Sequence, residues 1–181
     1  MFLAPSGANP PRAAFTLLEL LVVLGIVLVL AGTIVAAASH ASASGKAART
    51  RVELAVLAGA LEDYRRTYGD YPRTEDAALL LQSLLGRRDP GGAVVTGRAL
   101  VDLTRFTVGG ARDPSTDPSA QLVDAWAQPY RYAYKVQVPW VNSRFVLYSI
   151  GPDGCDSPAL LTGGFADAGS PLNADNLYAG P

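Results

Sequence analysis

The chain has 181 residues, a formal net charge of −1, one cysteine and one histidine. A charge so close to zero does not favour nucleic acid as a partner, a single cysteine excludes an internal disulfide, and one cysteine with one histidine cannot form the usual zinc patterns. Hydrophobic residues make up 49% of the chain and its mean hydropathy is +0.18, values raised by one apolar stretch near the N-terminus.

Residues 1–14 combine three prolines with a glycine and an asparagine. This composition disfavours regular structure and suits a removable leader. Residues 15–38 form an apolar run with one acid, Glu19. As a helix the run is roughly 36 Å long, enough to cross a hydrocarbon core of about 30 Å. We therefore expect one membrane-spanning helix.

Two features argue against a cleaved secretory signal. The apolar run is longer than a signal sequence requires, and no turn or breaker follows it. Glu19 also needs an explanation, because an ionisable group in an apolar helix is costly unless it is compensated. Either the carboxylate reaches the lipid headgroups, or it has a function within the membrane.

The sequence Phe-Thr-Leu-Leu-Glu-Leu-Leu from Phe15, after a short polar leader, resembles the N-terminus of type IV pilins and type II secretion pseudopilins. The resemblance implies that a prepilin peptidase cleaves between Ala14 and Phe15 on the cytoplasmic side and methylates the new amine. It also implies that Glu19 pairs with the terminal amine of a neighbouring subunit, which would compensate the buried carboxylate. Ala14 departs from the family, which nearly always has glycine there.

No proline occurs between Pro11 and Pro72, so a single helix of about fifty residues can run from the membrane into a soluble domain. Its second half, residues 39–68, is predicted to be amphipathic and to cover a core. The apolar side chains on which this prediction rests recur at steps of three and four residues: Leu54, Leu57, Leu61, Tyr64 and Tyr68.

Residues 69–181 are predicted to form the globular domain. Gly69 and Pro72 end the long helix, and Thr74 is the candidate N-cap of a short amphipathic helix over 75–85. Residues 89–122 are expected to be a long variable loop with one or two short strands, at 93–95 and 106–108.

Alternation of tyrosines with polar residues predicts a strand over 130–136, with 144–150 as its partner in a hairpin. Residues 151–181 have few apolar anchors and are expected to be an irregular C-terminal loop. The fold class is therefore α+β: a long N-terminal helix, membrane-spanning in its first half and amphipathic in its second, packed on a short helix and a small antiparallel sheet.

Four stretches narrow the resemblance to the major pseudopilin of type II secretion systems. They are Leu61–Tyr64, Tyr68–Pro72, Asp124–Tyr132 and Tyr148–Gly154. The chain departs from that family at Ala125, Ala127 and Gln128, where proline, glycine and asparagine are usual, and its middle loop is longer. A minor pseudopilin and a related type IV pilin remain open.

The same resemblance implies a calcium site in the C-terminal loop. Carried over to this chain, its ligands are the Ile150 carbonyl, Asp153 and Asp175, with Asn173 or Asp156 as extras. Calcium takes six to eight oxygen ligands, and its binding free energy would order a tail that has no disulfide. The alternative is that Asp153 and Gly154 form an ordinary turn.

An enzyme is not expected, because no histidine accompanies a candidate nucleophile and no phosphate-binding loop occurs. The expected function is a structural prepilin of a type II secretion pseudopilus. Its partners would be other pseudopilins, the prepilin peptidase and the secretion platform of the bacterial inner membrane, with a single span and the C-terminal domain in the periplasm or outside. The alternatives are a type IV or competence-type pilin, which adheres or takes up DNA, and an anchored single-span domain that never assembles.

Overall fold

The computed structural model describes residues 16–110, 113 and 116–180, and, within its first helix, not the side chains of residues 35, 36 and 39. Contacts divide the chain into two compact units, Met1–Ser42 and Ala43–Pro181. The expected leader, 1–14, and the expected cleavage junction between Ala14 and Phe15 lie outside the described residues.

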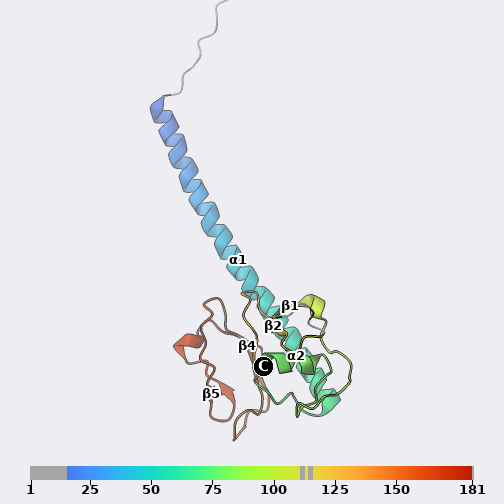
Figure 1. Cartoon of the computed structure of the whole chain (residues 1–181). Helices are drawn as coiled ribbons and strands as arrows, with labels where there is room; N and C mark the ends of the chain where they lie inside the picture. Colours follow the sequence, from blue (N-terminus) through green and yellow to red (C-terminus); the bar gives the residue numbers. More distant parts are fainter. Residues whose placement is uncertain (1–15, 111–112, 114–115, 181) are drawn as a thin grey trace, which may run out of the picture. The chain divides into compact units, whose positions relative to one another are not determined.

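Helix α1 extends from Leu17 to Tyr68 without interruption, and Figure 1 shows it as one ribbon. Its 52 residues confirm the single long helix that the absence of proline predicted. It ends where the sequence indicated. Gly69 adopts a left-handed φ of +86°, and its N–H donates to the Arg65 carbonyl at 2.8 Å.

The second half of α1 buries the predicted stripe. Leu54, Leu57, Leu61 and Tyr64 are at most 1% exposed, while Tyr68 is half-buried at the end of the helix. The helix therefore covers one side of the core, as its amphipathic pattern predicted.

Helix α2, Ala77–Leu84, is the expected short helix, but its N-cap is Asp76 and not Thr74. The Asp76 carboxylate accepts from the backbone N–H groups of Ala78 (2.7 Å) and Leu79 (3.1 Å). Thr74 lies outside the helix, and its hydroxyl accepts from the Asp76 N–H at 3.0 Å. Threonine and aspartate both cap helices, but here it is the Asp76 carboxylate that lies within hydrogen-bond distance of the two free N–H groups.

The expected loop over 89–122 contains a 3₁₀ turn and short strands. A 3₁₀ turn, η1 (Leu103–Arg105), leads into β1 (Thr107–Gly109), which pairs antiparallel with β2 (Gln121–Val123) through the register Val108↔Leu122. The apolar piece at 106–108 thus corresponds to a strand. The piece at 93–95 contributes only an isolated bridge, between Val94 and Arg88.

The main sheet has three antiparallel strands in the order β3–β4–β7: β3 is Arg131–Ala133, β4 is Val146–Ser149 and β7 is Leu177–Tyr178. The predicted pairing of the tyrosine-rich strand with its partner is confirmed by the register Tyr132↔Leu147. The first strand is shorter than the predicted 130–136, because Lys135 has a left-handed φ of +51° that ends the extended backbone.

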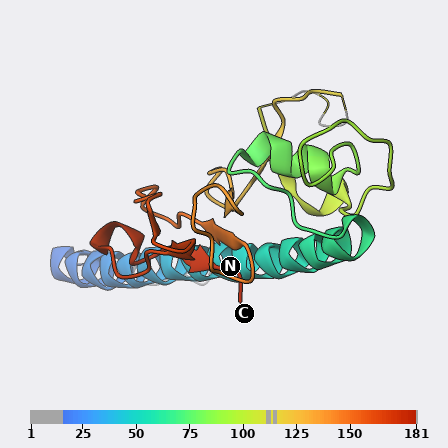
Figure 2. The same ribbon diagram turned by 90° about the horizontal axis from the view of Figure 1, so that it is seen from below.

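The C-terminal residues 151–180 are not simply irregular. They form the small hairpin β5 (Leu160–Leu161) with β6 (Phe165–Ala166), the turn η2 (Pro171–Asn173) and strand β7 on the edge of β4. In Figures 1 and 2 this red segment and the green segment around α2 lie on different sides of the globular unit. The Ser149↔Leu177 register attaches the tail to the sheet.

Most of the buried apolar residues form one cluster between α1, α2 and the sheets. Edge-on contacts of the Tyr71 ring with Tyr134 (5.1 Å between centroids) and Phe145 (5.0 Å) lie within it. Its leucines come from α1, α2, β2 and β4: Leu54, Leu57, Leu61, Leu80, Leu81, Leu84, Leu122 and Leu147.

Candidate functional site

The start of α1 is a capping box. The backbone N–H and the hydroxyl of Thr16 both donate to Glu19 Oε2 at 2.9 Å, and the Glu19 N–H donates back to Thr16 Oγ1 at 3.2 Å. This reciprocal pair satisfies helix-end donors that have no partner within the helix. The predicted assembly residue Glu19 is therefore also the residue that fixes the first turn. The sequence analysis missed Thr16, although Thr-x-x-Glu before an apolar run is the signature of this motif.

The helix beyond this cap can cross a membrane by length and composition. Leu17–Ile34 has a mean hydropathy of 2.7, and none of it is buried by the rest of the described chain. An apolar surface of this size needs a partner other than water, either lipid or other apolar helices. This agrees with a single-pass membrane protein.

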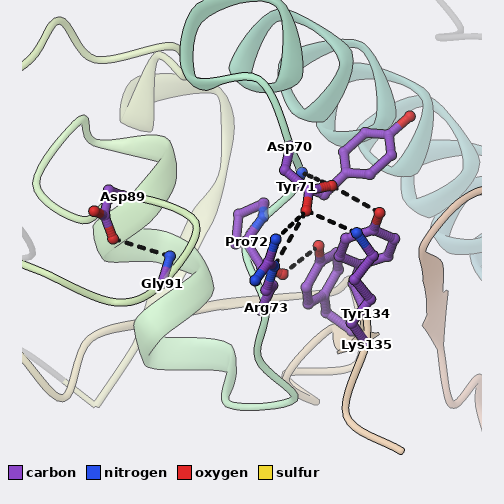
Figure 3. Close-up of polar contacts among 9 residues, drawn as sticks. Asp70, Tyr71, Pro72, Arg73, Asp89, Gly91, Tyr134 and Lys135 are labelled. Carbon is purple, nitrogen blue, oxygen red and sulfur yellow. Dashed lines mark hydrogen bonds and ion pairs between the residues drawn. The ribbon is translucent and has the colours of Figure 1, made fainter. Parts of the chain in front are cut away.

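Asp70 lies in the second of the four stretches that carry the narrower resemblance, and Figure 3 shows the polar contacts around it. Asp70 accepts from the Tyr134 hydroxyl at 2.7 Å and from Lys135 Nζ at 2.8 Å. Arg73 adds a fork of two bonds to the same carboxylate, at 3.1 and 2.9 Å. One carboxylate just beyond α1 thus connects the end of the helix to the segment after β3.

These bonds hold Asp70 in its charged form. Partial burial is the largest single influence on its pKa and raises it, but the hydrogen bonds from Lys135, Tyr134 and Arg73 together outweigh burial. The pKa of Asp70 therefore lies well below its usual range.

Buried hydroxyl groups join three of the four stretches. The Tyr132 hydroxyl donates to the Pro72 carbonyl at 2.8 Å, and the Ser149 hydroxyl donates to the fully buried Asp124 carboxylate. Asp124 also closes its own turn by accepting from the Gln128 N–H at 3.0 Å. These contacts position strands and turns and leave no reactive group exposed, so we assign them to structure.

Within the Asp124 turn, Ala127 has a left-handed φ of +65°. Glycine is the residue that adopts this conformation without strain, and it is the residue that the major pseudopilins usually have at this position. Ala127 therefore has a backbone conformation that favours glycine. The strain that its Cβ adds can be measured as a difference in the free energy of unfolding between alanine and glycine at this position.

The predicted calcium ligands come from two segments, one after Ile150 and one around Asp175, that lie against each other. Gly151, directly after Ile150, has a φ of +74°, and a side chain there would come within 2.7 Å of Asp175 Oδ2. The Asp153 N–H donates to the same oxygen at 3.2 Å. The fold therefore brings Gly151, the backbone of Asp153 and the Asp175 carboxylate together, while the Asp153 carboxylate accepts from the Cys155 N–H at 2.7 Å.

The side chain of Asn173 has hydrogen-bond partners of its own. Its amide oxygen accepts from the Ser157 N–H at 2.8 Å, and its amide nitrogen donates to the carbonyls of Asp167 (2.7 Å) and Ser157 (3.2 Å). Its polar atoms thus hold the C-terminal segment together. Asp156, the other extra, lies beside Arg131 at 3.2 Å.

Asn176 is a residue that the sequence analysis did not identify. Its side chain is buried at 9% exposure, and neither its oxygen nor its nitrogen has a hydrogen-bond partner among the described residues. A buried amide without a partner is rare and costly. It follows Asp175 directly in the chain, so a side-chain oxygen without a hydrogen-bond partner is next in sequence to a predicted ligand.

Among the described residues, no three or more histidine, cysteine, aspartate or glutamate side chains gather where they could hold a metal ion. A calcium ion here would therefore depend on backbone and amide oxygens as well as on two carboxylates. Cys155 is exposed, and its thiol lies 3.7 Å from the Asp153 carbonyl.

Comparison with known proteins identifies one feature. A family profile described as the prokaryotic N-terminal methylation motif matches residues 9–35. No curated protein and no solved structure matches the chain. The matched segment contains the expected cleavage junction, the capping box and the start of the membrane helix. The chain thus carries the processing motif of prepilins, which indicates a type IV pilin-like protein, a structural class that is in general not enzymatic.

Proposed function

We propose that this chain is a prepilin subunit of a type II secretion pseudopilus. The peptidase removes residues 1–14 and methylates Phe15, and the mature helix then leaves the lipid to join a bundle of equivalent helices. Growth of this filament drives protein export. The observation that carries the proposal is the methylation motif on a helix whose Leu17–Ile34 segment is entirely exposed.

Glu19 has two successive partners in this mechanism. Before assembly, Thr16 supplies two donors to the carboxylate, which lowers the cost of placing it at the membrane boundary. During assembly, the methylated amine of a neighbouring Phe15 approaches the same carboxylate as a cation. An ion pair in a low-dielectric environment has a strict geometry, so it sets the register between subunits.

The choice of a pseudopilus over a pilus rests on the four stretches. Hydrogen bonds link each stretch to the next, from Tyr71 to Glu62, from Tyr132 to Pro72 and from Ser149 to Asp124, which supports the idea that they act as one structural signature. A pilin of a DNA-uptake system is the competing assignment. It predicts retention of DNA by the protein with strong dependence on salt.

The decisive experiment is mass spectrometry of the mature N-terminus, in cells with and without the prepilin peptidase. A methylated Phe15 only in the presence of the peptidase is the expected result. An intact Met1 in both strains would contradict the proposal. Loss of secreted protein on deletion of this chain, with no loss of DNA uptake, would then separate the pseudopilus from a competence pilus.

We also propose that the C-terminal segment binds calcium. The Ile150 carbonyl, Asp153 and Asp175 would supply oxygens, as the resemblance implies. The side-chain oxygen of Asn176, which has no hydrogen-bond partner among the described residues, would be a further ligand. When bound, the ion would hold the segment after β4 against β7. Asn173 would support this segment structurally, because its amide accepts from the Ser157 N–H and donates to the Ser157 and Asp167 carbonyls.

A further inference from the structure

Five exposed apolar side chains lie on two loops of the Ala43–Pro181 unit. The first loop is residues 136–142, and the second is the β5–β6 hairpin over residues 160–166. Val138 is 99% exposed, more than Leu17 in the apolar helix, which is 79% exposed. We call the five residues the apolar platform: Val136, Val138, Val141, Leu161 and Phe165.

The two loops are fixed to each other. The Val141 N–H donates to the Gly163 carbonyl at 2.8 Å. The Gln137 side-chain amide donates to the Leu161 carbonyl, also at 2.8 Å. A Cβ built on Gly163 would lie 3.2 Å from the Phe165 ring and 3.3 Å from the Val141 Cβ, so both side chains flank this glycine. The apolar platform is therefore continuous across the two loops, on a backbone held in place by hydrogen bonds.

Neither loop contains a charged residue. Asp167 follows the second loop, and its carboxylate lies toward Gly169, where an added Cβ would be 3.6 Å away. A contiguous exposed apolar patch with charges only at its border is typical of a surface that binds a protein or a membrane. The apolar platform is therefore a candidate interaction surface.

Cations border the platform on the side of the first loop. Lys135 directly precedes this loop, and Arg144 follows it. The Lys135 Nζ lies 4.9 Å from the centre of the Tyr134 ring. The same ring makes an edge-on contact with Trp140 of the loop, at 5.6 Å between centroids. This cationic border thus adjoins the apolar residues of the loop.

The cationic border has more positive than negative charge. Four cations share two carboxylates, Asp70 and Glu62, and Figure 3 shows Arg73 and Lys135 at Asp70. The N···O distances are 2.8 Å for Lys135–Asp70, 2.9 Å for Arg73–Asp70, 3.3 Å for Arg144–Glu62 and 3.6 Å for Arg65–Glu62. The four cationic side chains are between 36% and 53% exposed, so a partner can reach them. This surplus of positive charge attracts carboxylates.

We propose that the apolar platform and its cationic border bind a segment of another protein that combines apolar residues with at least two carboxylates. The apolar side chains of this segment cover Val138 and Phe165, and its carboxylates accept from Arg144 and Lys135. An apolar centre beside a polar, charged rim is the usual anatomy of a protein–protein interface. Since the partner is not a further copy of this chain, the inference goes beyond the proposed function.

Two other kinds of partner fit this surface less well. A nucleic acid needs cations along its phosphates, whereas the centre of this surface is uncharged. An anionic bilayer attracts cations whatever their spacing, whereas ion pairs and ring contacts fix the cations here. Guanidinium groups in fixed positions match carboxylates on a protein segment. Charge complementarity thus favours an acidic protein segment.

The first test cross-links the surface in cells. The photoreactive amino acid p-benzoylphenylalanine replaces Val138 in the full chain, in cells that contain the peptidase and the secretion machinery. The matched control places the same group at Val94, which is 76% exposed on a different loop. The cross-link from Val138 should be several-fold stronger than the one from Val94. Mass spectrometry should locate it in a different protein, at a segment with apolar residues and at least two acids.

The other outcomes of this test overturn the proposal. They are a cross-link only to lipid, to nucleic acid or to a further copy of the chain, and a yield at Val138 no higher than at Val94. None of these results contradicts the proposed function. Methylation of Phe15 and filament formation in the same cells decide that function separately.

The second test changes the charge on the platform. A p-benzoylphenylalanine at Phe165 reports binding, while Val138→Asp and Val138→Lys each remove the same apolar contact. Because Val138 is almost completely exposed, neither variant should shift the thermal midpoint. Aspartate repels an acidic segment, so Val138→Asp should lower the cross-link yield by about tenfold, and Val138→Lys by several-fold less. Val94→Asp should leave the yield unchanged. Equal losses from the two Val138 variants, or no loss from Val138→Asp, overturn the acidic partner.

Discussion

Thr16 and Glu19 bind each other through three hydrogen bonds at the first turn of α1. The carboxylate that the resemblance assigns to assembly is thus satisfied within its own subunit. A charged partner from a neighbouring subunit must add to this arrangement or replace it. The capping role and the assembly role of Glu19 can therefore be separated by substitution.

Glu19→Gln keeps an oxygen that can accept from Thr16 and removes the charge, whereas Glu19→Ala removes both. We expect both variants to insert into the membrane and both to lose filament, because assembly needs the charge. Only Glu19→Ala should also loosen the first turn, seen as faster amide exchange at Thr16 and Leu20. Normal filament from Glu19→Gln would show that the charge has no part in assembly.

The N-cap of α2 contributes to the stability of the globular unit. Asp76→Ala leaves two N–H groups without an acceptor and should lower the free energy of unfolding by about 1 kcal/mol. The neighbouring Glu75, which is exposed and caps nothing, is the control, and Glu75→Ala should change stability by less than about 0.5 kcal/mol. Urea unfolding of the full chain in detergent, followed by tryptophan fluorescence, measures both.

The Asp70 carboxylate makes stability depend on acid pH. Its pKa is lower in the folded chain than in the unfolded one, so its contribution is complete above the ordinary value of about 4 and is lost as pH falls below it. Asp70→Asn should cost roughly 1–3 kcal/mol at pH 7, and less at pH 3. Asp63→Asn, which breaks an exposed pair with Arg66, should cost about 0–1 kcal/mol. A cost for Asp70→Asn that does not change with pH would contradict this account.

The left-handed backbone at Ala127 predicts a stabilising substitution. Ala127→Gly removes the strain of a Cβ at φ +65° and should raise the free energy of unfolding by roughly 1 kcal/mol. Ala125→Gly, two residues earlier in the same turn and without a positive φ, is the control and should be neutral or destabilising. If both substitutions destabilise equally, the turn relaxes in solution to another conformation.

Removal of calcium tests the proposed metal site. A chelator should lower the thermal midpoint of the full chain, and added calcium should restore it in proportion to its concentration. Asn176→Leu removes the unpaired amide and should weaken the response to calcium, whereas Asn173→Leu should destabilise the chain with and without calcium. No shift with chelator would remove the site.

Local patterns in the sequence predicted the helix and the hairpin that arise from residues close together in the chain. Absence of proline and a stripe at 3.6-residue spacing indicated α1 and its buried face, and alternation indicated the pairing of β3 with β4. The strand β7 was missed, because two residues carry almost no periodic signal and pair only through β4. The cap of α2 was assigned to the wrong neighbour, since Thr74 and Asp76 are both good capping residues.

The sequence by itself indicated a prepilin-type N-terminal methylation motif on an apolar helix, because that motif is contiguous and depends on side-chain chemistry alone. Only the tertiary structure decided how Asp70 joins the end of α1 to the segment after β3 and how β7 pairs with β4. These features depend on contacts between residues far apart in the chain. Their geometry follows from packing, which no local pattern encodes.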